Sequence, residues 1–271
     1  MFEAAAYDAG RTLFGLLSGL AVFRAMELAF PRAGAQPERP SSGAGIWLVY
    51  VGIQIALTTA ILIAVDASPA PQVDPTGLFG LPWWAVAVLV GIAFAVAQDF
   101  FFYWCHRIQH RWLWRWHAPH HSIRHMTAAN SWHHWSDIAV HAALVSLPMS
   151  LLSPAFGPRP FLIGVLISWQ PFYLHTATRL QLGPILRKLI VDGRHHRIHH
   201  SLEPRHFDRN FGTVTPLWDW LFGTVYFPTK DEWPDVGLAG VDQPGTLGEW
   251  SRLPWRMERG EDQPTVEKSA T

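Results

Sequence analysis

Apolar residues are gathered along this chain into long runs that short polar segments separate. Three runs, residues 13–30, 44–65 and 83–105, are long enough to cross a membrane as helices, because about 20 apolar residues span the hydrocarbon core. The second run contains no charged residue over 22 positions. The first carries Arg24 and Glu27 near its end, three residues apart, where they can pair on one helix face. The pattern therefore predicts three transmembrane helices.

Two further apolar runs, residues 138–152 and 161–173, are shorter, and each contains a proline, Pro148 or Pro171. Tilted spans, a re-entrant hairpin and helices packed at the membrane face all fit such lengths. A hairpin that enters and leaves on one side is favoured, since histidines that should meet flank both runs. We therefore expect an all-α protein, an integral membrane helical bundle of three clear spans and a short apolar helical hairpin.

Composition supports a membrane protein, with 49% hydrophobic and 15% charged residues. The formal net charge of zero gives no indication of a nucleic-acid partner. A single cysteine, Cys105, excludes an internal disulfide and any cysteine-rich zinc or iron–sulfur site. Several of the 15 tryptophans stand at the ends of apolar runs, where an interfacial aromatic belt would place them among the membrane lipids.

The distribution of basic residues predicts the orientation. Arginines are frequent after the first run and around the histidine-rich segments, whereas residues 66–82 contain no lysine or arginine. The positive-inside rule then places the histidines in a cytoplasmic helical cap and the N-terminus outside. We expect N-terminal transmembrane helices over residues 1–98, a histidine region with the hairpin over 99–227, and a C-terminal extension over 228–271. The polar end of that extension, residues 257–271, is expected to be disordered.

The chemistry-bearing residues are histidines in two clusters. Residues 99–121, DFFFYWCHRIQHRWLWRWHAPHH, contain five of them: His106, His110, His117, His120 and His121. Helical spacings of three and four residues place side chains on one face. The H-x-x-H-H spacing that ends the first cluster recurs at His196, His199 and His200. Eight imidazoles are too many for one metal ion and suit two ions that share a site, which could be iron, zinc, copper or nickel.

Other patterns narrow this interpretation. Proline is favoured in a first helical turn, so Pro119 predicts that a helix begins there and leaves His117 on the preceding turn. The chain has no H-E-x-x-H motif and no glycine-rich nucleotide loop. Soluble di-iron bundles use paired Glu-x-x-His motifs, whereas only Glu203 and His206 have that spacing here. His206 and the isolated His141 are expected to be ordinary polar residues.

Four segments carry a resemblance to a known family. DFFFYWCHRIQHRWLWRWHAPHHS, FYLHTATRL, GRHHRIHHS and DRNFGTVTPLWDWLFGTVY occur in this order between about residues 99 and 227. Together they resemble the fatty acid hydroxylase/sterol desaturase superfamily of membrane di-iron oxygenases.

The resemblance implies a non-haem centre of two Fe ions held by nine histidines. These are the eight above, His106, His110, His117, His120, His121, His196, His199 and His200, with His175 of the LHTATR segment added. Ligating histidines usually need an acceptor for the other ring nitrogen. The residues expected to surround the ligands in this way are Asp99, His195, Asn210 and Asp219. Whether His133 and His134 contact metal or substrate is left open.

The activity implied is O2-dependent hydroxylation or desaturation of a C–H bond in a lipid-like, apolar substrate. Two electrons must come from an external donor of the ferredoxin or cytochrome type, since no flavin or nicotinamide motif is present. Two other classes fit the histidines themselves. A membrane hydrolase would use two zinc ions to activate water, and a metal-handling membrane protein would be no enzyme at all.

Overall fold

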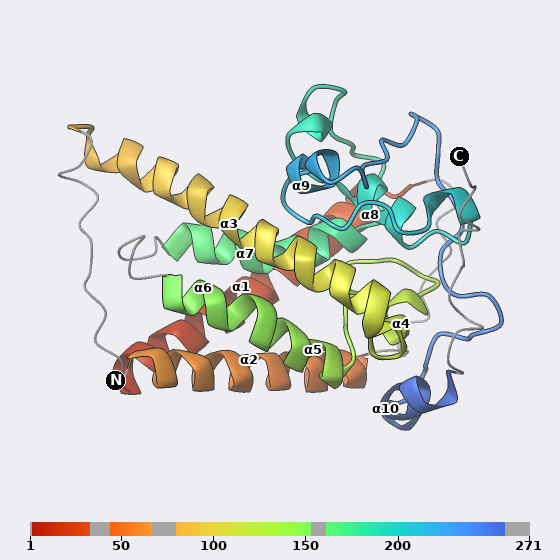
Figure 1. Cartoon of the computed structure of the whole chain (residues 1–271), viewed down its shortest axis with the longest axis horizontal. Helices are drawn as coiled ribbons and strands as arrows, with labels where there is room; N and C mark the ends of the chain where they lie inside the picture. The colour runs from red at the N-terminus through yellow and green to blue at the C-terminus, as the bar shows by residue number, and fades with distance from the viewer. Residues whose placement is uncertain (1, 33–43, 67–79, 153–160, 258–271) are drawn as a thin grey trace.

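The computed structural model describes residues 2–32, 44–66, 80–152 and 161–257, and within these ranges it contains helices and no strand (Figure 1). The all-α prediction is confirmed. The longer helices are α1 (Phe2–Ala29), α2 (Ala44–Asp66), α3 (Trp83–Trp112), α7 (Phe161–His175) and α10 (Leu247–Arg256). The shorter ones are α4 (Trp114–His121), α5 (Trp135–His141), α6 (Leu147–Leu152), α8 (Gly193–His199) and α9 (Leu217–Leu221). Of the predicted disordered tail, residues 257–271, all but Met257 lie outside the described residues, and Met257 is buried.

Four segments are long and apolar enough to cross a membrane: Ala9–Ala29, Gly45–Val65, Trp83–Trp112 and Trp135–Leu152. The first three correspond to the predicted spans. The fourth is the first arm of the predicted hairpin and is longer than expected. There α5 and α6 join through a π-helical turn, Ala142–Ser146, in which the Leu147 N–H bonds the Ala142 carbonyl. This wide turn lies directly before Pro148, which has no N–H to continue an α-helical pattern.

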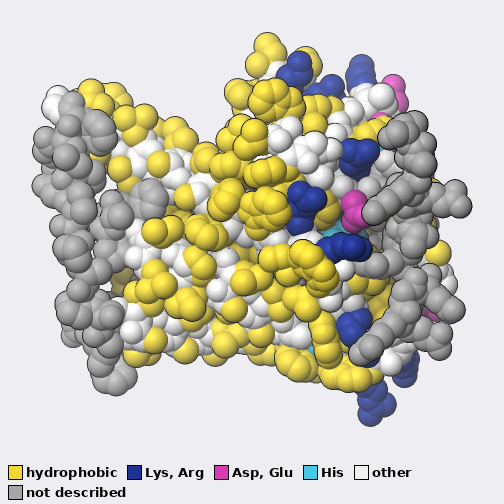
Figure 2. Space-filling view, viewed as in Figure 1, with side chains coloured by type: hydrophobic (Ala, Val, Ile, Leu, Met, Phe, Trp, Pro, Cys, Tyr) yellow, Lys and Arg dark blue, Asp and Glu magenta, His cyan; other side chains and the backbone are white. Residues whose placement is uncertain are grey.

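The long helices lie roughly alongside one another, and the short helices α4, α8 and α9 gather at one end of the bundle (Figure 1). Large apolar side chains project outward from the long helices, as a lipid-facing surface requires; Leu48 is 66% exposed. Figure 2 shows these side chains along the bundle and lysines and arginines near the end with the short helices. The exposed side chains of Trp83 and Trp104 lie about 30 Å apart along α3, close to the hydrocarbon thickness.

Helix α1 packs closely against α7 because it carries glycine at Gly15 and Gly19. A Cβ atom at Gly15 would lie 2.7 Å from Ser168 Cβ, and one at Gly19 would lie 2.8 Å from Phe172 Cδ2. The indole N–H of Trp169 also donates to Ser18 Oγ across this contact, at 2.9 Å. Small residues four apart are a common means of close helix packing in membranes. This contact fixes α7, and with it His175, against the first span.

Substitution of Gly15 by alanine should therefore destabilise the protein by about 1–3 kcal/mol, the usual cost of overpacking. Gly10 on the same helix is the matched control, because a Cβ atom there would meet nothing within 4 Å. Gly10→Ala should leave stability unchanged or raise it by up to about 1 kcal/mol through helix propensity. Thermal unfolding of both variants in one detergent tests this. A Gly15→Ala protein as stable as Gly10→Ala would contradict the close packing.

Glu27 ties the end of α1 to the histidine end of the molecule. Its carboxylate is buried, receives the backbone N–H groups of Ala128 and Ala177 at 2.8 and 2.9 Å, and pairs with Arg24 at 2.9 Å. The expected Arg24–Glu27 pair is thus present. Ala177 lies two residues after His175, the last residue of α7. Its hydrogen bond to Glu27 therefore also fixes the backbone next to His175.

Candidate metal centre

The nine histidines predicted as ligands converge at the end of the bundle and form two groups. The first group is His106, His110, His117, His121 and His199, and the second group is His120, His175, His196 and His200. All nine are buried, and within each group one ring nitrogen from every residue lies within 4.8 Å of the others. Residues almost 100 positions apart in the sequence are thus brought together, eight of them indicated by their spacing and His175 by the family resemblance.

Four helices supply these side chains. The last turns of α3 carry His106 and His110, and α4 carries His117, His120 and His121. The end of α7 supplies His175, while α8 and the residue after it supply His196, His199 and His200. In the H-x-x-H-H spacing, adjacent histidines point in directions about 100° apart around the helix. Both H-x-x-H-H segments therefore contribute histidines to both groups.

The expectation for Pro119 was wrong. Helix α4 begins at Trp114, contains Pro119 in its second turn and keeps His117 in the same helix as His120. Proline is tolerated because α4 is only 8 residues long and ends two residues later. The Ser122 hydroxyl then donates to the Pro119 carbonyl at 2.7 Å and satisfies one terminal acceptor.

Ring hydrogen bonds fix which nitrogens of the first group carry lone pairs. His106 Nδ1 lies 2.9 Å from the Phe211 carbonyl, and His117 Nδ1 lies 3.0 Å from the Asp137 carboxylate. These oxygens can only accept, so both Nδ1 atoms carry the proton and both Nε2 atoms carry a lone pair. The two Nε2 atoms nevertheless lie 3.0 Å apart. Two lone pairs at this distance repel unless a cation lies between them, so this donor set fits a metal ion.

The second group has the same character. His120 Nδ1 lies 2.9 Å from the Trp132 carbonyl, which leaves its Nε2 as a lone pair. The Nε2 atom of His196 lies 3.2 Å from that of His175 and 3.1 Å from that of His200. The Nδ1 atoms of these three residues are buried and have no hydrogen-bond partner among the described residues. A single proton cannot satisfy three converging nitrogens, whereas a metal ion can.

The two groups adjoin each other, since the rings of His121 and His200 stack with centroids 4.4 Å apart. Burial also favours the neutral form of most of these ligands. It lowers the pKa of His199 to about 3 and lowers the pKa values of His121 and His200 well below the usual value, with neighbouring histidines acting in the same direction on His121 and His200. Neutral imidazole is the form that binds a metal. The arrangement can therefore hold two adjacent ions.

The four residues predicted to surround the ligands support the loop over residues 208–215 rather than the rings themselves. Asp99 receives the backbone N–H groups of Thr213, Val214 and Thr215 at 2.8–3.1 Å. Asp219 receives the N–H groups of Phe211 and Gly212 at 2.8 and 2.7 Å. This loop presents the carbonyl of Phe211 to His106 and that of Arg209 to His199. Asp99 and Asp219 thus do not bond the ligand rings directly; they hold the loop whose carbonyls bond the rings.

Asn210 and His195 support the same loop. Asn210 has a φ of 60° and its amide bonds the backbone of His195 and Tyr226 at 2.7–3.0 Å. His195 is buried, belongs to neither group and hydrogen-bonds Asp219. Burial would raise the pKa of Asp219, but its hydrogen bond with His195 holds it below the ordinary range.

Asp137 is a residue of the site that the sequence analysis missed. It lies at the start of α5, is buried, and accepts hydrogen bonds from His117 at 3.0 Å, from His133 at 2.6 Å and from the Gln109 amide. It forms a third group of potential ligand atoms with His117 and His133. Two signals could have found it: a carboxylate at the start of an apolar run, and a spacing of four from His133.

The remaining histidines differ in their surroundings. His133 stacks on His120 with centroids 3.8 Å apart, whereas His134 caps α5 and bonds Ser136. His206 is buried between Ser201 and Glu232, at 2.8 and 3.1 Å, as expected for a structural polar residue. His141 contacts Ser146 at 3.4 Å and lines a cavity.

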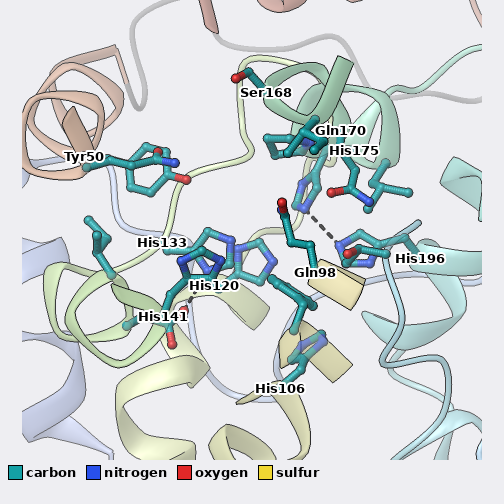
Figure 3. A pocket seen from close by; sticks show the side chains of 18 of the residues that line it. Tyr50, Gln98, His106, His120, His133, His141, Ser168, Gln170, His175 and His196 are labelled. Carbon is teal, nitrogen blue, oxygen red and sulfur yellow. Dashed lines mark hydrogen bonds and ion pairs between the residues drawn. The ribbon is translucent and has the colours of Figure 1, made fainter. Parts of the chain in front are cut away.

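That cavity, of about 180 Å³, extends from the histidines between α1, α2, α3, α5 and α7 (Figure 3). Histidines of both groups line it: His106, His120, His175 and His196. Figure 3 shows His120 and His196 on opposite sides of Gln98, which projects between them. Apolar residues such as Leu16, Phe102 and Leu174 form much of the rest. A molecule in this cavity would lie directly against the metal centre.

Comparison with known proteins places this region in a family. Residues 91–224 match the fatty acid hydroxylase family model. Ornithine lipid hydroxylase OlsE of Rhizobium tropici is 31% identical over 205 residues, which cover 73% of this chain and 60% of that protein. Alkylglycerol monooxygenase of Danio rerio is 29% identical over 180 residues, covering 63% of this chain and 37% of that protein.

The human alkylglycerol monooxygenase is 30% identical over 173 residues, covering 60% of this chain and 35% of that protein. This chain thus spans 60% of the length of the ornithine lipid hydroxylase and little more than a third of the two monooxygenases. No solved structure matches it significantly. The matched region contains both histidine groups and the loop over residues 208–215.

Proposed function

Because the chain belongs to the fatty acid hydroxylase/sterol desaturase superfamily, we propose that it is a membrane monooxygenase whose nine buried histidines hold two iron ions. The activity proposed is hydroxylation of a C–H bond in a lipid. The observation that carries the proposal is the pair of adjoining groups whose Nε2 lone pairs converge at 3.0–3.2 Å. Imidazole ligands suit iron, zinc, copper and nickel, and the family resemblance favours iron among them.

The protein's own groups hold and orient the reactants. In the overall reaction one oxygen atom of O2 enters the C–H bond and the other leaves as water, with two electrons and two protons supplied from outside; the bound metal supplies this oxidising chemistry. His106 and His120 present both metal positions to the cavity. Leu16, Phe102 and Leu174 offer an apolar wall to a lipid chain and exclude water from the reacting carbon.

Electrons would enter from the end of the bundle that carries the histidines. His110 Nδ1 lies 3.4 Å from the Asp208 carboxylate at the surface. The positive charges of Arg107, Arg111 and Arg209 lie close enough to act on that carboxylate. They oppose partial burial, which raises the pKa of Asp208 overall. We propose that this basic rim receives an acidic ferredoxin or cytochrome, since complementary charges speed association. By the positive-inside rule this end faces the cytoplasm.

Metal analysis of the purified protein tests the proposal. We expect two irons per chain, loss of lipid oxidation on removal of the iron, and recovery when ferrous iron is restored. Mass spectrometry of products formed under 18O2 should show one labelled oxygen in the lipid.

Other outcomes would contradict it distinctly. Two zinc ions with activity in the absence of oxygen would identify a hydrolase. Substoichiometric metal of several kinds without oxygen consumption would identify a metal-handling protein. An unlabelled product with a new double bond would replace hydroxylation by desaturation on the same centre.

A further inference from the structure

The cavity wall contains two side-chain amides with unused hydrogen-bonding atoms. Gln54 Oε1 on α2 and Gln170 Nε2 on α7 are fully buried and have no hydrogen-bond partner among the described residues. Both residues line the cavity that ends at the histidines. More than nine in ten buried polar groups in native proteins are paired, so two unpaired ones on residues that line the same cavity indicate a missing ligand.

Both amides lie within reach of the same molecule that contacts the metal centre. Gln170 precedes His175 by five residues on α7, which is about 7.5 Å along the helix. Gln54 lies one turn beyond Tyr50 on α2, and Tyr50 packs on His133 with ring centroids 5.9 Å apart. When the reacting carbon of a substrate lies at the histidines, a polar group roughly five to eight bonds further along the same molecule would therefore reach these amides.

The charge of the lining restricts what that group can be. No lysine or arginine lines the described part of the cavity, and its carboxylate, Asp137, is already bonded to His117, His133 and Gln109. A charged group would have no counter-ion there except the metal, and burial of an unpaired charge is costly. A bare hydrocarbon chain would leave both amides unpaired.

We propose that Gln54 and Gln170 determine specificity for a lipid with a neutral group that both donates and accepts a hydrogen bond, a secondary amide or a hydroxyl, near the carbon that is oxidised. The group's oxygen accepts from Gln170 Nε2, and its N–H or O–H donates to Gln54 Oε1. Such a group also satisfies both amides when both are turned over together, because its oxygen then accepts from Gln54 Nε2 and its N–H or O–H donates to Gln170 Oε1. The inference rests on the proposed function for the identity of the reaction at this cavity.

Binding to the iron-loaded protein in lipid nanodiscs tests this without turnover. The probes are an N-methyl fatty amide, a fatty alcohol and an n-alkane of equal chain length, compared by competition against a fluorescent fatty amide. The amide, the alcohol or both should bind at least about tenfold more tightly than the alkane, because a site built for hydrogen bonds rejects analogues that lack them. A preference between amide and alcohol identifies which of the two groups the cavity takes.

The variants Gln54→Met and Gln170→Met keep side-chain length and remove the amide. Each should abolish most of this preference and leave alkane binding unchanged. Thr58→Val is the matched control, since it removes a polar group one turn along α2 that does not line the cavity. Equal binding of the alkane, the amide and the alcohol by the unmodified protein, or an undiminished preference in both variants, would overturn the inference.

Product analysis after O2 and a chemical reductant are added to the same samples separates the two proposals. Selective amide or alcohol binding without any lipid oxidation by the iron-loaded protein would refute the monooxygenase and retain the specificity site. Oxidation of all three probes at similar rates, unaffected by either glutamine variant, would retain the monooxygenase and refute the specificity site.

Discussion

Replacement of His199 or His120 by alanine is expected to abolish lipid oxidation and to remove iron from one group at a time. His199 belongs to the first group and His120 to the second. Both rings are buried. Each substitution also removes a ring N–H that donates to a backbone carbonyl, that of Arg209 for His199 and that of Trp132 for His120. Loss of a group that merely supports a ligand costs about 10–100-fold, so loss of a ligand itself should cost more than about 100-fold in activity.

Iron per chain and product formation measured on the same preparations check this. His125→Ala is the control, because His125 lies on the loop after α4, close in sequence to the ligands, and belongs to neither group. It should keep two irons and full activity. If His120→Ala and His199→Ala each kept full iron content and activity, the two-group centre would be wrong.

The fold followed from the sequence wherever hydrophobic length alone decides it. The uncharged run on α2 and the run on α3 admit few alternatives in a bilayer, because every backbone polar group must be bonded within the helix. The hydrophobic pattern did not predict that the hairpin arm begins at Trp135. The first turn of α5 contains the polar residues Ser136 and Asp137, which do not belong to an apolar run. The contact of Gly15 with Ser168 depends on which helices become neighbours, which composition does not state.

Within the site, helical spacing predicted which histidines share a face but not their division into two groups. That division depends on how α3, α4, α7 and α8 are placed in space. His175 entered only through the family resemblance, because a single histidine after an apolar run has no distinctive spacing. The acceptors at Phe211, Arg209 and Trp132 are backbone carbonyls. Every residue has a carbonyl, so no sequence pattern marks these three.

Asp137→Asn should weaken iron binding to the first group and lower kcat/KM by about 10–100-fold, although Asp137 need not touch metal or substrate. One carboxylate oxygen, Oδ2, accepts from both His117 and His133, and the other accepts from the Gln109 amide. An asparagine keeps the size but loses the negative charge, and its NH2 group must face one of these three donors. In either orientation the His117 ring loses the charged partner that holds its Nε2 toward His106.

A positioning role makes a prediction that a purely structural role does not. The metal-free Asp137→Asn protein should unfold near the temperature of the unmodified metal-free protein, whereas the iron-loaded variant should gain less stability from iron, because ligand binding stabilises in proportion to affinity. Asp242→Asn is the control, since Asp242 is 96% exposed and pairs only at the surface with Arg124. Unchanged iron affinity in Asp137→Asn, together with lowered stability of the metal-free protein, would show that Asp137 serves the fold and not the metal centre.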